Sequence, residues 1–96
     1  MIRVRFQKNA LEAAGHAGSA PKGEDLVCAA FSMLVFTLEA NLRQIDPPGL
    51  EIISRPGEVK IRWEESKKAE EALRFTQNGV RLLAEKYPQW VEAMEN

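Results

Sequence analysis

Hydrophobic and polar residues alternate along the first seven positions of the chain, which reads Met-Ile-Arg-Val-Arg-Phe-Gln. A period of two places every second side chain on the same face of a strand, so residues 1–7 predict a strand with one buried face. Lys8 and Asn9 suit a tight turn, and residues 11–17 predict a second strand. The alanines of that second strand weaken its pattern, since alanine is depleted in strands.

Two longer segments carry patterns typical of helices. Residues 24–43 contain no proline or glycine and are apolar on nearly every side as far as Phe36. They predict a helix buried on more than one side, against a sheet and against a second helix or a second subunit. Residues 66–87 have apolar residues at spacings of three and four, with Ser66 as the candidate N-cap and Pro88 as the stop. Four aromatic residues stand at core spacing, namely Phe31, Phe36, Trp63 and Phe75.

Prolines and glycines separate the other elements. Residues 46–49, Asp-Pro-Pro-Gly, end the first helix because proline cannot donate a backbone hydrogen bond. Residues 50–54 and 59–63 predict a second pair of strands. Pro56 and Gly57 lie between them, and this dipeptide suits the centre of a type II turn.

The order of the predicted elements is β-β-α-β-β-α. Residues 17–23, with two glycines, a serine and a proline, predict a loop before the first helix, and residues 90–94 predict a last short turn folded back on the body. We expect an α+β fold, a two-layer sandwich in which one mostly antiparallel sheet carries both helices on one face. Residues 1–96 should form a single domain with a thin core, because a chain of this size buries only about 60 to 65% of its unfolded surface. Association into a dimer would extend that core.

Charge and composition limit the classes of partner. Thirteen basic and fourteen acidic residues give a net charge of -1, so no overall field draws the chain to nucleic acid or to an anionic membrane. The longest apolar run, residues 26–35, is too short for a bilayer, which takes about 20 residues, and the N-terminus lacks the apolar core of a signal peptide. A single cysteine forms no internal disulfide, so its thiol is either free or paired between chains, and a free thiol suits a reducing compartment. We therefore expect a cytoplasmic protein.

The one histidine and the one cysteine of the chain lie twelve positions apart, as His16 and Cys28. His16 is expected at the end of the second strand, and Cys28 in the first turn of the first helix if Asp25 is its N-cap. A helix N-terminus favours a thiolate, and a histidine takes up the thiol proton, so the pair fits a cysteine nucleophile with a histidine general base. By residue type alone, the two residues are also consistent with a small buried cysteine and a surface histidine that have no catalytic role.

Two neighbours of the pair each have two interpretations. Asp25 either orients His16 or only caps the helix. Ser32 lies one helical turn after Cys28 on the same face, where it either lines the site or bonds to a backbone carbonyl, and we favour the structural role. Backbone amides at the start of the helix, including that of Cys28, are the expected oxyanion donors.

Gly15, Ala17, Gly18 and Gly23 belong to the expected substrate loop. Glycine lets a peptide backbone approach closely, although these glycines also suit plain turns. We expect residues 17–23 to be mobile without substrate and to order over it. With one histidine and one cysteine, no metal site and no cofactor are expected.

Two motifs surround the pair, Gly15-His16-Ala17-Gly18 and Gly23-x-Asp25-Leu26-Val27-Cys28-Ala29-Ala30-x-Ser32. Together they closely resemble the signature of the Prp family, the ribosomal-processing cysteine proteases. The resemblance covers essentially the whole chain, including Tyr-Pro-Gln-Trp at residues 87–90. Leu26 and Phe31 depart from the usual pattern without touching the proposed chemistry.

The resemblance implies a homodimeric cysteine endopeptidase with Cys28 as the nucleophile and His16 as the general base. The implied substrate is an extended segment of a large-subunit ribosomal protein precursor, from which a short N-terminal extension is removed during ribosome assembly. No membrane and no direct contact with nucleic acid are expected. The alternative, from a different functional class, is a non-catalytic dimer that binds ribosomes or RNA. Its support is a modest basic patch made of Arg3, Arg5, Lys8, Lys60 and Arg62.

Overall fold

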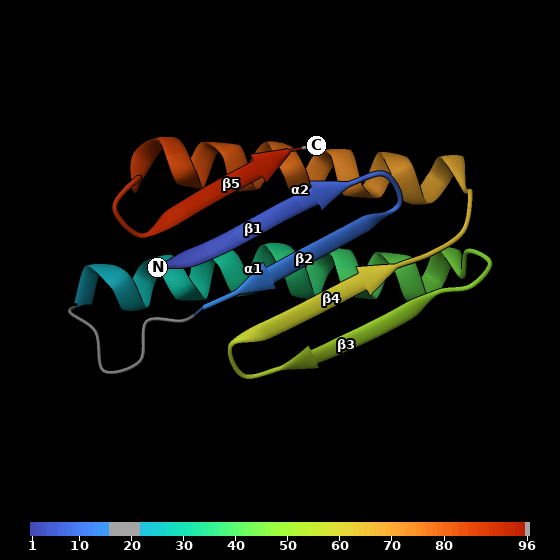
Figure 1. Cartoon of the computed structure of the whole chain (residues 1–96), viewed down its shortest axis with the longest axis horizontal. Helices are drawn as coiled ribbons and strands as arrows, with labels where there is room; N and C mark the ends of the chain where they lie inside the picture. Colours follow the sequence, from blue (N-terminus) through green and yellow to red (C-terminus); the bar gives the residue numbers. More distant parts are fainter. Residues whose placement is uncertain (16–21, 96) are drawn as a thin grey trace.

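The alternating segments and the two apolar segments form two layers. The computed structural model describes residues 1–15 and 22–95, and in this part of the chain five strands form one sheet that carries two helices on one face (Figure 1). The elements are β1 (Ile2–Gln7), β2 (Ala10–Ala14), α1 (Lys22–Ile45), β3 (Glu51–Arg55), β4 (Glu58–Arg62), α2 (Lys67–Lys86) and β5 (Val91–Glu95). The predicted α+β fold with both helices on one face is confirmed.

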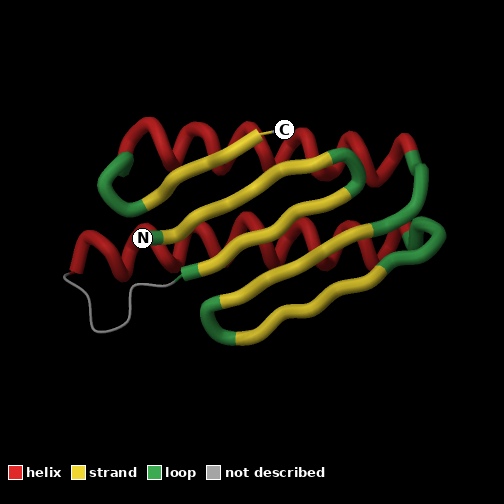
Figure 2. The backbone as a smooth tube through the Cα atoms, in the orientation of Figure 1, coloured by secondary structure: helices red, strands yellow, loops and turns green. Residues whose placement is uncertain are grey.

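The strands lie in the order β3-β4-β2-β1-β5 (Figure 2). The pairs β1–β2, β2–β4 and β3–β4 are antiparallel, whereas β1 and β5 are parallel. Both predicted hairpins are present, and Gly57 at the second turn has φ 80°, the conformation that a type II turn requires. The sheet is therefore mostly antiparallel, as predicted, with one parallel pair.

The C-terminal strand β5 corrects the prediction of a short final turn over residues 90–94. Beyond α2 the rings of Tyr87 and Trp90 stack with centroids 6.0 Å apart. The Ile2 amide then donates to the Trp90 carbonyl oxygen at 2.8 Å, and Ile2 pairs with Val91 in the parallel ladder. A local pattern does not reveal such a strand, because the partner that stabilises it lies at the other end of the chain.

Helix α1 is longer than predicted at both ends. It begins at Lys22, so the prediction of a loop as far as Gly23 is wrong by two residues, and it ends at Ile45 directly before the Asp-Pro-Pro-Gly segment. The Asp46 backbone has φ 52°, and its amide donates to the Leu42 carbonyl oxygen at 2.7 Å, which closes the helix. Strand β2 ends at Ala14, earlier than the predicted residue 17.

Helix α2 agrees closely with its prediction. Ser66 is its N-cap, and the Ser66 hydroxyl oxygen accepts a hydrogen bond from the Ala69 amide at 3.2 Å. The buried face of α2 carries Ala69, Leu73, Thr76, Val80 and Leu83. A Cβ on Gly79 would lie 2.6 Å from Leu34 Cδ2, so glycine at this position lets α2 approach α1 closely.

The core lies between the sheet and the helices, and α1 supplies a large part of it. The largest fully buried side chains of the core are Leu11, Leu38, Leu42, Ile61, Val4, Val27, Val35, Val80 and Val91. Phe31 and Trp63 are buried as predicted, but the prediction is wrong for Phe36 and Phe75, which are 55% and 72% exposed. Helix α1 is apolar nearly all round and has more apolar surface than its contacts with the sheet and α2 cover, so Phe36 stays outside.

Among the described residues one helical stretch, Leu26–Ile45, is long and apolar enough to cross a membrane by length and composition. Core helices of soluble proteins share these properties. In this structure the stretch packs against the sheet through Val35, Leu38 and Leu42, which are at most 1% exposed. A third of its most apolar window is buried inside the structure, so the fold accounts for part of its apolar character.

The sheet face without helices is charged but balanced. Arg62 Nη2 lies 2.9 Å from a Glu51 carboxylate oxygen. In the register of β1, β2 and β4, Glu12 lies between Arg5 and Lys60. The basic residues that supported RNA binding are therefore interleaved with carboxylates, which weakens any local positive field.

An ion pair ties α2 to the edge strand β5. The Arg81 guanidinium donates two hydrogen bonds to the Glu95 carboxylate, from Nε at 2.6 Å and from Nη2 at 2.8 Å. These hydrogen bonds, with the positive charge of Arg81, lower the pKa of Glu95 below its ordinary value of 4.5.

We predict that this pair contributes to the pH dependence of stability. A carboxylate whose pKa is lower in the folded than in the unfolded chain stabilises the fold above its unfolded pKa, and this contribution is lost as the pH falls through its folded pKa. The free energy of unfolding should therefore decrease below about pH 5, and Glu95→Gln should make that decrease shallower. Urea unfolding from neutral to acidic pH measures this effect, and Arg81→Met should reproduce it. Parallel pH profiles of the three proteins would contradict the role of the pair.

Candidate active site

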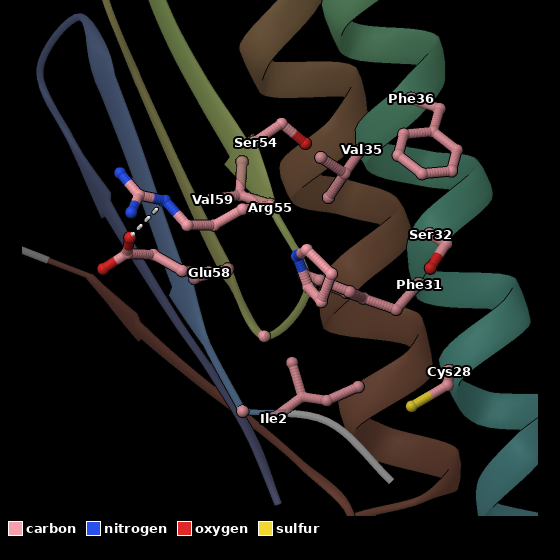
Figure 3. Close-up of a pocket in the computed structure, with 14 residues that line it drawn as sticks. Ile2, Cys28, Phe31, Ser32, Val35, Phe36, Ser54, Arg55, Glu58 and Val59 are labelled. Atoms are coloured by element: carbon pink, nitrogen blue, oxygen red, sulfur yellow. Dashed lines mark ion pairs between the residues drawn. The ribbon is translucent and has the colours of Figure 1, made fainter. Parts of the chain in front are cut away.

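Cys28 lies at a cavity between α1 and the β3–β4 hairpin (Figure 3). The cavity has a volume of about 440 Å³. Helix α1 contributes Cys28, Phe31, Ser32, Val35 and Phe36, the hairpin contributes residues 54–59, and Ile2, Ala13 and Gly15 complete the lining. The walls are mainly apolar, with an ion pair at the rim between Arg55 and Glu58, whose Nε and Oε1 atoms lie 3.2 Å apart.

Cys28 is a free cysteine and is half-buried, packed against the hydrophobic core. Figure 3 shows its side chain pointing from α1 toward Ile2 and the sheet. Its place in the helix differs from the prediction, because α1 begins at Lys22, six residues before Cys28. Cys28 therefore lies beyond the first turn, where the favourable effect of a helix N-terminus on a thiolate has largely fallen off.

The early start of α1 also corrects two roles predicted near Cys28. Asp25 lies within the helix, so its predicted place at the N-cap is wrong. The backbone amide of a residue beyond the first four of a helix is engaged in the helix itself, so the Cys28 amide is not the free oxyanion donor that was expected. Neither correction affects the other interpretation of Asp25, in which it orients His16, and that interpretation stays a prediction.

Ser32 lies on the same flank of α1 as Cys28, as its spacing predicts, and both side chains line the cavity. This position agrees with the first interpretation of Ser32, in which it lines the site, and a hydrogen bond to a backbone carbonyl stays a prediction.

Gly15 directly follows the last residue of β2 and lines the cavity. Its φ is 105°, and a Cβ at this position would overlap the Met1 carbonyl oxygen. The Gly15 amide donates to the Gly57 carbonyl oxygen at 3.0 Å. Glycine is therefore required here by the backbone, which gives a physical reason for the first residue of the Gly-His-Ala-Gly motif.

Of the remaining predicted site residues, only Gly23 is among the residues that the structure describes. His16, Ala17 and Gly18 lie outside the described residues, and so does most of the predicted substrate loop. Gly23 lies in the first turn of α1. The predicted approach of His16 to Cys28 thus stays a prediction, with Gly15 placing the start of that segment.

Sequence reasoning missed the hairpin side of the cavity. Ser54, Arg55 and Glu58 were assigned only to strands and to their turn, and Phe36 to the core. No local signal marks these residues as cavity walls, since only the packing of the hairpin against α1 brings them to Cys28. Within residues 1–15 and 22–95, no group of three histidine, cysteine or acidic residues is arranged to hold a metal ion.

Comparison with known proteins points to one family. Residues 1–92 match the family model described as cysteine protease Prp. The ribosomal processing cysteine protease Prp of Mycoplasma genitalium is 50% identical over 36 residues, which are 38% of this chain and 36% of that protein. The matched segment thus spans about a third of the length of this curated relative.

Solved structures share the fold over nearly the whole chain. A crystal structure of a Streptococcus mutans protein has 30% sequence identity and a TM-score of 0.82, and the match covers 99% of this chain and 93% of that one. The Staphylococcus aureus protease Prp in complex with a substrate peptide has 19% identity and a TM-score of 0.88, with both chains covered completely. At that identity the second likeness concerns the fold alone.

We predict that Gly15→Ala destabilises the fold by about 2 kcal/mol or more, because it combines a strained φ with an overlap against backbone. Gly49→Ala is the matched control. Gly49 has φ 66°, but its Cβ would meet only the flexible Glu64 side chain, so we expect a loss of about 1 kcal/mol. Urea unfolding measures both values, and equal losses would contradict the tight contact with Met1.

Proposed function

The chain belongs to the family of Prp cysteine proteases, and we propose that it cleaves peptide bonds with Cys28 as the nucleophile and His16 as the general base. The observation that carries this proposal is the position of Cys28. It is the one cysteine of the chain, and it faces a cavity of about 440 Å³ instead of being enclosed in the core. A cavity of this size is within the usual range for binding sites.

The proposed reaction has two halves. His16 takes the thiol proton of Cys28, and the thiolate attacks the carbonyl carbon of the substrate peptide bond. The tetrahedral intermediate collapses to a thioester as the amine leaves with the proton from His16. Water then attacks the thioester, with His16 taking its proton and returning one to the sulfur, which releases the acid product and restores the thiol.

The activation of Cys28 rests mainly on His16 in this mechanism. Because Cys28 lies beyond the first turn of α1, the helix N-terminus contributes little to stabilising the thiolate. Asp25 is proposed to support His16 by orienting its ring, as carboxylates do for many histidines.

We propose as substrate the precursor of a large-subunit ribosomal protein, from which an N-terminal extension is removed. Support comes from the Mycoplasma genitalium relative, which is named a ribosomal processing protease, and from the substrate-peptide complex of the Staphylococcus aureus protein. With this function we propose that the protein acts in the cytoplasm, where ribosomes assemble.

A peptide spanning the junction between the extension and the mature protein tests the proposal. We expect Cys28→Ala to abolish cleavage and His16→Ala to lower kcat by about 100-fold to 10,000-fold. Asp25→Asn should lower it by about 10-fold to 100-fold if Asp25 orients His16. Ser32→Ala, which changes the same cavity, is the control and should retain most of the activity. Undiminished cleavage by Cys28→Ala would sink the assignment, and salt-dependent RNA binding by every variant would favour the non-catalytic alternative.

We also propose that two copies associate through the outer faces of α1 and α2. Met33 and Phe75 are 64% and 72% exposed and line an apolar groove between these helices. Lys86 is the one charged residue in the described lining of this groove. Two identical grooves therefore meet around a two-fold axis with little repulsion between like charges.

Sedimentation analysis tests this association. We expect the wild type to sediment as a dimer and Phe75→Asp to dissociate it, because a carboxylate would be buried without a partner. Arg74→Glu, which changes an exposed residue of α2 that does not line the groove, should leave the dimer intact. A monomeric wild type would overturn the proposal.

A further inference from the structure

One flank of α1 carries a line of residues that leads away from Cys28. Cys28, Ser32 and Phe36 follow each other at intervals of four residues, so they lie on one flank of the helix, and all three line the cavity. Phe36 is 55% exposed, an unusual state for a phenylalanine. Phe31 and Val35, which line the same wall, are almost completely buried and so hold the wall in place.

The opposite wall is the inner face of the β3–β4 hairpin. Ser54 and Val59 are paired across the two strands and both line the cavity. Strand β3 is an edge strand of the sheet (Figure 2), and four of its five residues are exposed. The cavity is therefore open along one side, and its apolar walls lack a covering element among the described residues.

The length of this cleft suits an extended peptide. Eight residues of α-helix, from Cys28 to Phe36, rise by about 12 Å. An extended chain advances by about 3.3 Å per residue, so it covers this distance in about three to four residues. A peptide whose scissile carbonyl lies at Cys28 thus brings one further side chain opposite Phe36.

We propose that Phe36 is a specificity-determining residue, which with the hairpin holds an apolar side chain of the substrate about three to four residues from the scissile bond. The inference rests on the proposed function. It adds a second place where the enzyme recognises the substrate, at a distance from the scissile bond. Burial between Phe36 and the hairpin removes apolar surface of both partners from water, which favours an apolar over a polar side chain at this position.

A series of peptides tests this role. Each differs from a cleaved parent peptide by a substitution to alanine at one of the positions from the second to the fifth, on either side of the bond. For the wild type we expect that, on one side of the bond, alanine at the third or the fourth position from the bond lowers kcat/KM about tenfold or more. In Phe36→Ala this dependence should disappear, while the substitutions next to the bond keep their effect.

Ile53→Ala is the control, because it removes an exposed apolar side chain from strand β3 that lines neither the cavity nor the proposed dimer groove, and it should keep the wild-type profile. Binding of the same peptides in the Cys28→Ala background, measured by fluorescence anisotropy, should show the same coupling between Phe36 and that position. A Phe36→Ala profile equal to that of the wild type, or a wild type indifferent to every third and fourth position, would overturn the inference alone. Cleavage that survives Cys28→Ala would instead overturn the proposed function, and the binding series would still report on the cleft.

Discussion

Strand β1 is paired on both of its sides, and this pairing positions the other strands, the two helices and the start of the candidate site. Its apolar residues Ile2, Val4 and Phe6 are each at most 3% exposed. On one side β1 pairs with β2 as a tight hairpin, and on the other it takes β5 in parallel from the far end of the chain. Helix α2 connects β4 to β5 across the same face of the sheet that α1 covers, and so brings β5 alongside β1.

The start of β1 also shapes the candidate active site. Ile2 lines the cavity that holds Cys28, and the Met1 carbonyl oxygen leaves no room for a side chain at Gly15. The Gly15 amide is in turn bonded to Gly57 at the tip of the second hairpin. The strand pairing that stabilises the core thus also determines where the chain leaves the sheet toward His16.

Much of the fold was predictable from local patterns, and the reason is that these patterns reflect local physics. The alternation in residues 1–7, the Pro-Gly turn and the Ser66 cap each depend on a few neighbouring residues, and each prediction is confirmed. Strand β5 and the exposure of Phe36 and Phe75 depend on contacts between distant segments, and these were missed. The start of α1 was misplaced because glycine and proline near Lys22 resemble a loop, whereas the helix includes Lys22 and Gly23.

The available chemistry could be predicted from the residues alone, since the chain has one cysteine and one histidine within motifs of a protease family. The sequence also determined the number and kind of most elements, because hydrophobic period and turn residues act locally. In contrast, the position of Cys28 beyond the first turn of α1 and the facing wall formed by the β3–β4 hairpin became visible only in the folded chain. The physical reason is that a cavity is made by side chains from separate segments, and their meeting is set by sheet order and helix packing.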